Sequence, residues 1–345
     1  MRSIGGSAGA PIFAGEGSAS GSGPETNESC VVMPREIGCF RFRSLNSCRS
    51  RPRPTSVESG ASSTPSAAGL CPNQNHVVTG SPAFAGDDML FDDMLFNEII
   101  PEQIPGAQVD RRFAIADASE IPVAGVALVA DLAGALYWPE ERLLVISDLH
   151  LEKGSSFARR GVLLPPYDTA STLDRLAGAL SRYAVRTVVA LGDSFHDQNG
   201  PARLAAVDRA KLKELQRGRN WVWIAGNHDP DPADGLGGVF ATSLSLWPLS
   251  FRHEPTPQAS PGEIAGHLHP VARVSQRSRT LTRRCFVSDG ARLVMPAFGA
   301  YAGGLNIRHA AFVEVFGALA FTAHVLGQRR LFAFAAMRCV ADGSP

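Results

Sequence analysis

The residues of this chain that could do chemistry together fall in five short segments between positions 148 and 269. Leaving His228 and Asp229 aside, the segments supply two carboxylates, one side-chain amide and four imidazoles of the kind that bind metals. They are Asp148-Leu149-His150, Gly192-Asp193, Gly226-Asn227-His228-Asp229, His253 and Gly266-His267-Leu268-His269. Such a set is large enough to hold two divalent ions side by side.

A site of this kind suits the hydrolysis of phosphoesters. Two ions about 3.5–4 Å apart can activate a bridging hydroxide and clamp both the phosphorus and the leaving oxygen. Carboxylate and amide oxygens mixed with imidazole nitrogens suit Mn, Fe or Zn, and no cysteine lies near the five segments. A single Asp-x-His or Gly-Asn-His is more often a loop or a turn, so it is the occurrence of all five that predicts a two-metal phosphoesterase.

Short apolar runs lead into the first three segments and read as β-strands. These runs cover residues 142–147, 187–191 and 221–225. Residues 168–183 place three leucines on one helical face, and residues 202–217 are also helix-like. The resulting βαβαβ pattern predicts an α/β fold with parallel strands, whose carboxyl ends meet at one edge of the sheet. The three segments should therefore converge there.

Further strands are expected on both sides of this unit. A leading pair covers residues 122–130 and 134–138. The later candidates are residues 285–288, 292–295, 311–316 and 319–323. Helices therefore cluster in the first half of the domain and strands in the second, and the pattern alone indicates an α/β fold with a β-rich second half.

The five segments resemble the calcineurin-like metallophosphoesterase superfamily, whose pattern is D-x-H, GD, GNH[DE], a separate His and GHxH. Longer strings resemble its PdeM subgroup, the ligase-associated DNA damage response endonucleases. These strings are residues 147–161, 163–169, 192–197, 223–230, 251–255, 262–270 and 295–299. The similarity spans about residues 120 to 325. It implies a four-layer α/β/β/α sandwich, with two sheets packed face to face and helices outside.

The resemblance also implies a role for each matching residue. The ligands of the first ion would be Asp148, His150 and His269. The ligands of the second ion would be Asn227, His253 and His267. Asp193 would bridge the two ions. His228 would face the phosphate and protonate the leaving oxygen or steady the transition state, and Asp229 would orient His228.

Other polar residues allow two interpretations. His196 and Asp197 follow the bridging carboxylate and could contact the substrate phosphate, or they could form a hydrogen-bonded pair within a loop. Arg159 and Arg160 follow the first motif and are candidates for substrate binding. An arginine run without an intervening acid follows His269, and it could track a nucleic-acid backbone or form a solvated hairpin face. The run consists of Arg273, Arg277, Arg279, Arg283 and Arg284.

The remaining aromatic and imidazole residues have plainer predictions. Trp221 and Trp223 alternate along a strand and are expected to fill the core rather than to stack on bases. His309 and His324 lie outside the motifs and are expected to be structural or exposed.

Composition sets the wider limits. The chain has 345 residues and a formal net charge of zero, so it offers no overall positive field for nucleic acid. Its six cysteines include no CxxC pair, which excludes a zinc knuckle or a redox dithiol. Since no apolar stretch approaches 18 residues and no signal segment is evident, we expect a cytoplasmic protein without a membrane partner.

The N-terminal third differs from the rest in composition. Residues 1–88 are rich in Gly, Ser, Pro and Ala, and such a segment buries too little apolar surface to offset its ordering entropy. We expect a disordered extension, or sequence upstream of the native start with Met89 and Met94 as alternative starts. The expected division is an extension over 1–118, a metallophosphoesterase domain over 119–327 and a tail over 328–345.

Three functions follow. The subgroup resemblance implies a Mn-dependent DNA endonuclease that belongs to a repair set with a DNA ligase. The second function is a phosphatase or phosphodiesterase for nucleotides or other small phosphoesters. The third is a non-catalytic scaffold of the same fold, which the complete ligand set disfavours. Fe or Zn could replace Mn, and the oligomeric state is open.

Overall fold

The structure, a computed structural model, describes residues 41–42, 118–231, 233, 235–257, 260–276 and 279–343. Within residues 1–88 of the predicted extension only Arg41–Phe42 are described, and they form a short strand that pairs with residues 244–245. The rest of those residues, the proposed starts at Met89 and Met94, and Arg277 lie outside the described residues. No helix in the described ranges is both long and apolar enough to cross a membrane.

One of the two sheets of the described chain has seven strands in the order β2-β3-β4-β5-β6-β7-β8. These are β2 (Ala118–Val123), β3 (Val126–Asp131), β4 (Leu136–Trp138), β5 (Leu143–Ile146), β6 (Thr187–Leu191), β7 (Asn220–Ile224) and β8 (Val239–Ala241). Neighbours from β2 to β5 are antiparallel, and neighbours from β5 to β8 are parallel. The predicted parallel unit is therefore confirmed.

The second sheet has ten strands. Eight follow the order β1-β9-β10-β11-β14-β13-β12-β15, while β16 pairs with β13 and with β17. They are β1 (Arg41–Phe42), β9 (Ser243–Leu246), β10 (Leu249–Arg252), β11 (Glu263–Ala265), β12 (Pro270–Gln276), β13 (Arg279–Ser288), β14 (Leu293–Val294), β15 (Leu305–Asn306), β16 (Thr322–Leu326) and β17 (Leu331–Ala335). Strands β10 and β11 are parallel neighbours, which brings the segments that follow them to one edge.

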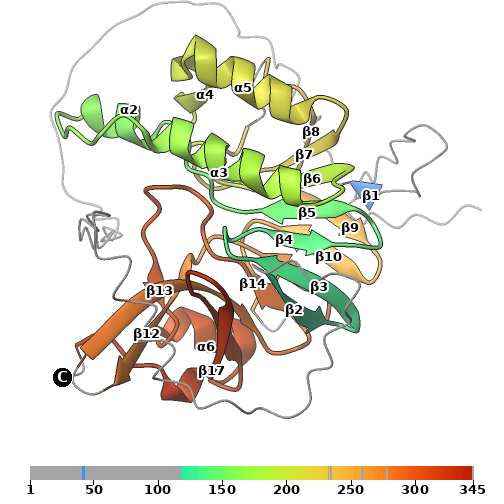
Figure 1. The fold of residues 1–345 in the computed structure, drawn as a ribbon, viewed down its shortest axis with the longest axis vertical. Helices are drawn as coiled ribbons and strands as arrows, with labels where there is room; N and C mark the ends of the chain where they lie inside the picture. The colour runs from blue at the N-terminus through green and yellow to red at the C-terminus, as the bar shows by residue number, and fades with distance from the viewer. Residues whose placement is uncertain are drawn as a thin grey trace, which may run out of the picture.

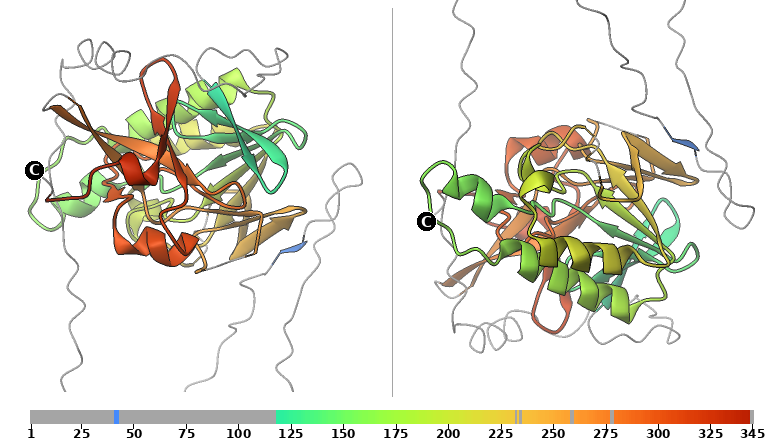
Figure 2. Two further views of the ribbon diagram at one scale, coloured as in Figure 1. Left: turned by 90° about the horizontal axis from the view of Figure 1, so that it is seen from below. Right: turned by 90° about the horizontal axis from the view of Figure 1, so that it is seen from above.

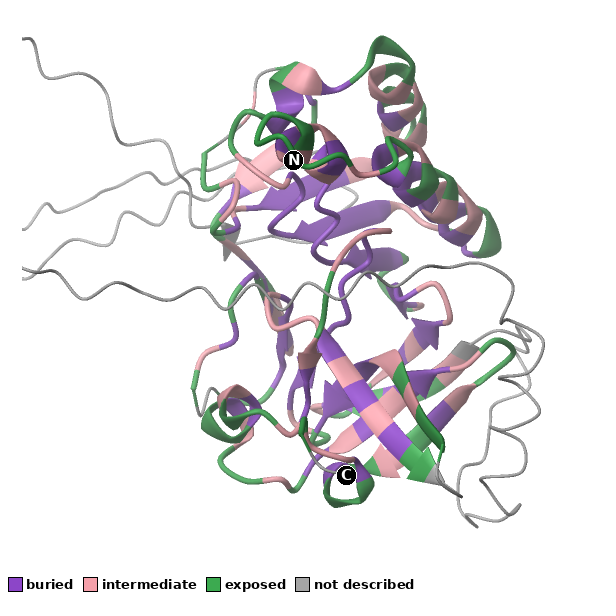
Figure 3. Cartoon of the chain, turned by 90° about the vertical axis from the view of Figure 1, so that its left-hand side faces the viewer, coloured by how far each residue is buried: buried purple, intermediate pink, exposed green. Residues whose placement is uncertain are grey.

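The helices lie outside these sheets. They are α2 (Lys153–Ala158), α3 (Asp168–Arg182), α4 (Gly200–Arg203), α5 (Ala206–Gln216), α6 (Ala310–Phe316) and the 3-10 helix η2 (Ala336–Arg338). Helices α3 and α5 run side by side over the seven-stranded sheet, and α6 lies against the other sheet (Figures 1 and 2). The outer faces of α3 and α5 are exposed while the strands beneath them are buried (Figure 3).

Three apolar cores join the layers. Val145 and Val189 of the first sheet pack in one core with Phe251 of the second, so the sheets meet face to face. Opposite faces of the same central strands pack against α3 and α5, with Leu173 and Leu212 among the contacts. A third core joins the outer face of the second sheet to α6. The fold is a four-layer α/β/β/α sandwich, as expected.

Several predicted elements match closely and others do not. The strand predicted over residues 187–191 is β6, and the helix predicted over residues 168–183 is α3. The helix predicted over residues 202–217 is divided, because Leu204 and Ala205 leave the helical conformation between α4 and α5. The strand predicted over 122–130 is a hairpin, because Ala124 and Gly125 adopt φ values of 49° and 82° and turn the chain.

The strand predicted over residues 311–316 was wrong, because that segment is helix α6. The His309 ring accepts a hydrogen bond from the Ala311 N–H at 3.2 Å and caps the helix start. Gly317 ends the helix with φ of 76°. Phe312 and Val315 both face the core, at helical spacing, although the alternating apolar letters suggested a strand.

The segment predicted to be a C-terminal tail contributes to the second sheet. It forms β17, which pairs antiparallel with β16. Phe332 and Cys339 are buried in the third core. The Arg308 side chain donates to the carbonyl oxygens of residues 336, 337 and 339. The segment therefore packs on the described domain.

Candidate metal centre

Strand ends of both sheets bring the predicted ligands together. Asp148 lies two residues after β5, Asp193 two residues after β6 and Asn227 three residues after β7. In the other sheet, His253 follows β10 directly and His267 lies two residues after β11. The centre therefore lies where the carboxyl ends of two parallel strand groups meet.

The first ligand cluster consists of Asp148, His150 and His269. The Nε2 atom of His269 lies 3.2 Å from Asp148 Oδ1 and 3.2 Å from His150 Nε2. The Nδ1 atom of His269 is 3.2 Å from the carbonyl oxygen of Gly303. A carbonyl oxygen can only accept, so Nδ1 carries the proton and Nε2 presents its lone pair to the cluster.

The second cluster consists of Asp193, His253 and His267, with Asn227 beside it. His253 donates from Nδ1 to the carbonyl oxygen of Leu191 at 2.8 Å, so its Nε2 also presents a lone pair. That Nε2 lies 2.9 Å from Asn227 Oδ1 and 3.4 Å from Asp193 Oδ1. The seven predicted ligands are thus assembled in two adjacent groups, with Asp193 between them, because its Oδ2 also lies 3.9 Å from His150 Nε2.

The donor set fits metal cations. In both clusters, lone pairs of nitrogen and oxygen atoms face one another at 2.9–3.4 Å without a proton donor for each. Such an arrangement repels itself unless a cation lies among the acceptors. The ligands would hold two divalent ions, and the mixture of oxygen and imidazole donors suits Mn, Fe or Zn.

Burial and neighbouring charges shift the pKa of two ligands toward the forms that bind metal. Burial alone would raise the pKa of the Asp148 carboxyl, but the imidazoles of His269, His253 and His150 hold it well below its usual range. Burial lowers the pKa of His150, and the His269 imidazole lowers it further. Asp148 therefore stays ionised and His150 stays neutral, as metal coordination requires. Burial would lower the pKa of His269, but the Asp148 charge outweighs this effect and raises it.

The motif glycines leave space for the ligands. A Cβ atom on Gly192 would lie 2.6 Å from the ring of His253. A Cβ atom on Gly226 would collide with the backbone nitrogen and carboxylate of Asp193, and one on Gly266 would collide with Ser147. These glycines are required because side chains of the centre occupy the space beside them.

His228 belongs to neither of these two ligand clusters, but it forms a third group of metal-competent side chains with His150 and His196. Its side chain is 38% exposed, and its Nε2 is 3.9 Å from Asp193 Oδ2. Its Nδ1 donates to the carbonyl oxygen of His196 at 2.8 Å. The ring is therefore fixed with Nε2 toward the bridging carboxylate.

The expected contact between Asp229 and His228 is not made. Asp229 instead accepts a hydrogen bond from the backbone N–H of Phe195 at 3.0 Å, while the His228 ring donates to the carbonyl oxygen of His196. Burial, together with the Asp193 charge, raises the pKa of Asp229 to about 7. The residue that orients the His228 ring is His196, through its backbone oxygen.

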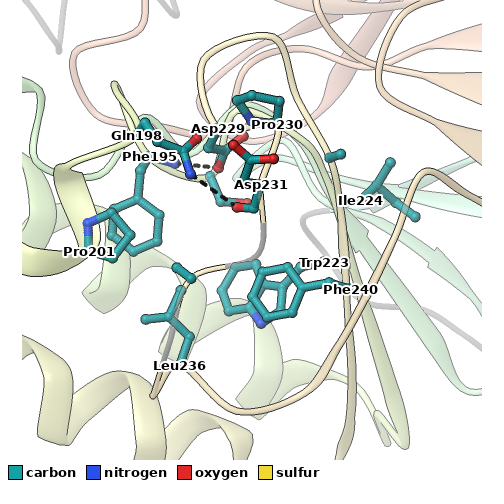
Figure 4. A pocket seen from close by; sticks show the side chains of 13 residues that line it. Phe195, Gln198, Pro201, Trp223, Ile224, Asp229, Pro230, Asp231, Leu236 and Phe240 are labelled. Atoms are coloured by element: carbon teal, nitrogen blue, oxygen red, sulfur yellow. Dashed lines mark hydrogen bonds between the residues drawn. The ribbon is translucent and has the colours of Figure 1, made fainter. Parts of the chain in front are cut away.

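Asp229 also borders a pocket with mainly apolar walls (Figure 4). Phe195, Trp223 and Phe240 line it, and Gln198 closes it by donating to the carbonyl oxygen of Asp231 at 3.4 Å. Trp221 and Trp223 are both buried in the helix-side core, so the prediction that they fill the core is confirmed.

The predicted substrate residues separate into two groups. His196 stacks on His228 with ring centroids 5.2 Å apart, and its Nε2 is 3.4 Å from an Arg160 nitrogen. Asp197 instead forms a bidentate ion pair with Arg203 at 2.9 and 2.7 Å, so it belongs to the loop. Arg159 is exposed at the end of α2.

The arginine run after His269 is only partly a free surface. Arg284 is partly buried, and its guanidinium donates to the carbonyl oxygen of Ala297 at 2.8 Å. Arg273 donates to the carbonyl oxygen of Ala341 and lies 3.9 Å from Asp342. Arg279 is exposed near the hairpin tip. Arg283 donates to the carbonyl oxygen of Thr282 at 3.2 Å. Three of the four described arginines of the run therefore make contacts within the fold.

Sequence reasoning missed Lys153. This residue begins α2, three positions after His150, and its Nζ donates to the carbonyl oxygen of Tyr301 at 2.8 Å. The loop that carries Tyr301 also carries Gly303, which fixes His269. A signal was present, because a lysine follows the first metal motif within one helical turn.

Comparison with known proteins agrees with this geometry. Residues 141–290 match a family model described as calcineurin-like phosphoesterase. The nuclease MPE of Pseudomonas putida, known from a crystal structure, is 30% identical in sequence; the match covers 63% of this chain and 100% of that chain, with a TM-score of 0.49. No curated protein matched. The chain belongs to the calcineurin-like metallophosphoesterase superfamily, whose members hydrolyse phosphoester bonds with divalent metal ions.

Proposed function

We propose that this protein is a nuclease that hydrolyses phosphodiester bonds of DNA, with Mn as its metal, in a repair set that includes a DNA ligase. The observation that carries the hydrolytic part is the complete ligand set, whose lone pairs converge in two adjacent clusters. The choice of DNA is supported by the PdeM-like strings and by the 30% sequence identity to a protein described as a nuclease.

The chain's own residues would act as follows. Divalent ions held by the two clusters would supply an activated water and neutralise charge on the phosphate. Asp193 lies between the clusters and would fix their spacing. His228, held by the carbonyl oxygen of His196, would donate a proton from Nε2 to the departing oxygen as the phosphorus–oxygen bond breaks.

We assign the activity to the cytoplasm. Cys285 and Cys339 are both buried and free, and both belong to one core. Burial raises the pKa of each thiol, which keeps both protonated and unreactive. Free thiols are typical of proteins in a reducing compartment.

A small phosphoester is the second candidate substrate. Two observations favour it: the formal net charge is zero, and Arg273 and Arg284 are engaged within the fold. A small substrate needs no extended basic surface.

One experiment separates these functions. The full-length protein, stripped of metal and re-supplied with Mn, is assayed on circular single-stranded DNA, bis-p-nitrophenyl phosphate and p-nitrophenyl phosphate, with Asp193→Ala as the control. Nicking of the circle by wild type and not by the variant supports a DNA endonuclease. Turnover of small esters alone moves the substrate to nucleotides or other small phosphoesters, and turnover of nothing supports a scaffold.

A further inference from the structure

Two cations lie beside the metal centre, one at the start of helix α2 and one just after its end. Lys153 and Arg160 begin and follow α2, and both contact the ring of Phe157: Lys153 Nζ is 5.9 Å and the Arg160 guanidinium carbon 4.7 Å from its centroid. The Phe157 centroid is 5.5 Å from that of His196, and His196 is 5.5 Å from His150. The ring of Phe157 therefore joins both cations to the His150 side of the centre.

Neither cation has its charge cancelled by a hydrogen-bonded carboxylate. Lys153 Nζ donates to the neutral carbonyl oxygen of Tyr301, and Arg160 donates to Ser156 and meets His196. Lys153 is half-buried, and burial lowers its pKa while the charge of Asp168 opposes this shift. Burial lowers the pKa of His196 and of His150, and the Lys153 charge lowers both further.

Lys153 and Arg160 could bind an anion in addition to the scissile phosphate, which the metal ions would bind. The scissile phosphate would already have two metal ions as partners, so further cations beside it suit a substrate that carries a second phosphate next to the first. A nucleic-acid strand carries such a phosphate on each nucleotide. In the segment that follows Arg160 in the chain, Leu163 and Tyr167 are 85% and 66% exposed, and unpaired bases could rest on such side chains.

We propose that Lys153 and Arg160 form a subsite for the phosphate that neighbours the scissile phosphate in a single-stranded oligonucleotide. Lys153 is then a positioning residue, because it holds the strand in register without touching the bond that breaks. This inference rests on the proposed hydrolysis of phosphodiesters. The neighbouring phosphate is the feature that distinguishes an oligonucleotide from a small diester. Arg160 adds a second contact, and His196 lies between this subsite and His228.

Three matched substrates isolate the neighbouring phosphate. They are the p-nitrophenyl ester of thymidine phosphate, the same ester of the dinucleotide TpT, and that dinucleotide with its internal linkage replaced by a neutral methylphosphonate, each made in both polarities. The scissile bond is identical in all three. In one polarity, wild-type kcat/KM should be about tenfold higher for the dinucleotide than for the other two, because one charged hydrogen bond has roughly that effect.

The variants locate the effect. Lys153→Gln and Arg160→Gln should reduce the preference for the charged linkage by about tenfold, whereas Lys213→Gln, an equal charge loss on the exposed end of α5, should keep it. Lys153→Arg should restore part of it. On the metal-free protein, each Gln variant should weaken binding of a labelled single strand and lower the salt slope by about 0.7. Metal content and melting temperature should match wild type, since a structural role alone would lower them.

Each contrary result has a distinct meaning. A wild-type enzyme without the dinucleotide preference in either polarity, or a Lys153→Gln variant that keeps it, overturns the subsite. Equal losses on all three esters place Lys153 at the scissile group or in the framework and also overturn it. If wild type shows the preference and fails to nick circular DNA, the subsite stands and the endonuclease proposal fails; if it nicks DNA and shows no preference, the reverse holds.

Discussion

At the scale of single residues, one hydrogen bond per imidazole decides which nitrogen serves the centre. Backbone carbonyls of Leu191, Gly303 and His196 accept from the Nδ1 atoms of His253, His269 and His228. Each bond therefore fixes Nε2 toward the clusters. A sequence motif specifies the imidazole, and the fold specifies its tautomer.

Replacing the carboxylate between the clusters should be the most damaging single change. Asp193→Ala should lower kcat/KM on bis-p-nitrophenyl phosphate by about a thousandfold or more and reduce bound metal, since Asp193 lies beside ligands of both clusters. Metal content by mass spectrometry and steady-state kinetics check it. A variant that retained two ions and near wild-type turnover would contradict the bridging position.

Replacing His228 should separate chemistry from metal binding. His228→Gln should lower kcat by about 10²–10⁴ while leaving metal content as in wild type, because the ring belongs to neither of the two clusters that contain the predicted ligands and its Nδ1 is held by the carbonyl oxygen of His196. The effect should be smaller for p-nitrophenolate, which leaves without a proton, than for a nucleoside alkoxide. Loss of metal from this variant would show that His228 is a ligand after all.

At the scale of elements, the parallel unit could be predicted and the second sheet could be predicted only in part. Strands β5, β6 and β7 are buried on both faces, so they read as continuous apolar runs in the sequence. Strands β9 to β12 are short or half-exposed and gave little periodic signal. Helix α6 was mistaken because apolar residues on a two-turn helix also alternate, and only its caps decide the outcome.

The metal ligands could be predicted from the sequence, whereas the contacts around them could not. Each ligand lies in a motif that combines residue type and spacing, whereas Lys153, Tyr301 and Gly303 come together only in the folded chain. The orientation of His228 also depends on a backbone oxygen, which carries no residue identity. Positions held by main-chain atoms are therefore absent from sequence patterns.

An imidazole on β16 should make stability depend on pH. Burial lowers the pKa of His324 to about 4 from an ordinary value of 6.5. The unfolded chain then binds this proton first as pH falls, so stability present above pH 6.5 is lost progressively down to about pH 4. His324→Gln should reduce this loss by about 1–3 kcal/mol, measured by urea unfolding at pH 7 and pH 5.

The comparison has a matched control. Lys213 is exposed on α5, and Lys213→Gln should leave the acid-induced loss as in wild type. If His324→Gln and wild type lose stability in parallel between pH 7 and pH 5, the buried imidazole is not the cause.

At the scale of the whole molecule, the residues after position 327 are part of the packed domain. Asn306 donates to Val340 and Asp342, Val340 donates to Arg273, and Phe332 fills the third core. Ending the chain at residue 327 should therefore expose that core and lower the melting temperature by several degrees or prevent folding. Ending it at residue 343 is the control, and equal melting temperatures for the two truncated chains would contradict the packing.

Five of the ligand-bearing residues have left-handed backbones. Asp148, His150, Asp193, His267 and His269 adopt φ between 44° and 68°, a conformation that side-chain-bearing residues avoid at a cost of about 1–3 kcal/mol each. Ions bound only by the folded chain would offset this cost by mass action. Metal supply would then set how much folded protein a cell keeps as well as how fast that protein works, and chelation would act first on abundance.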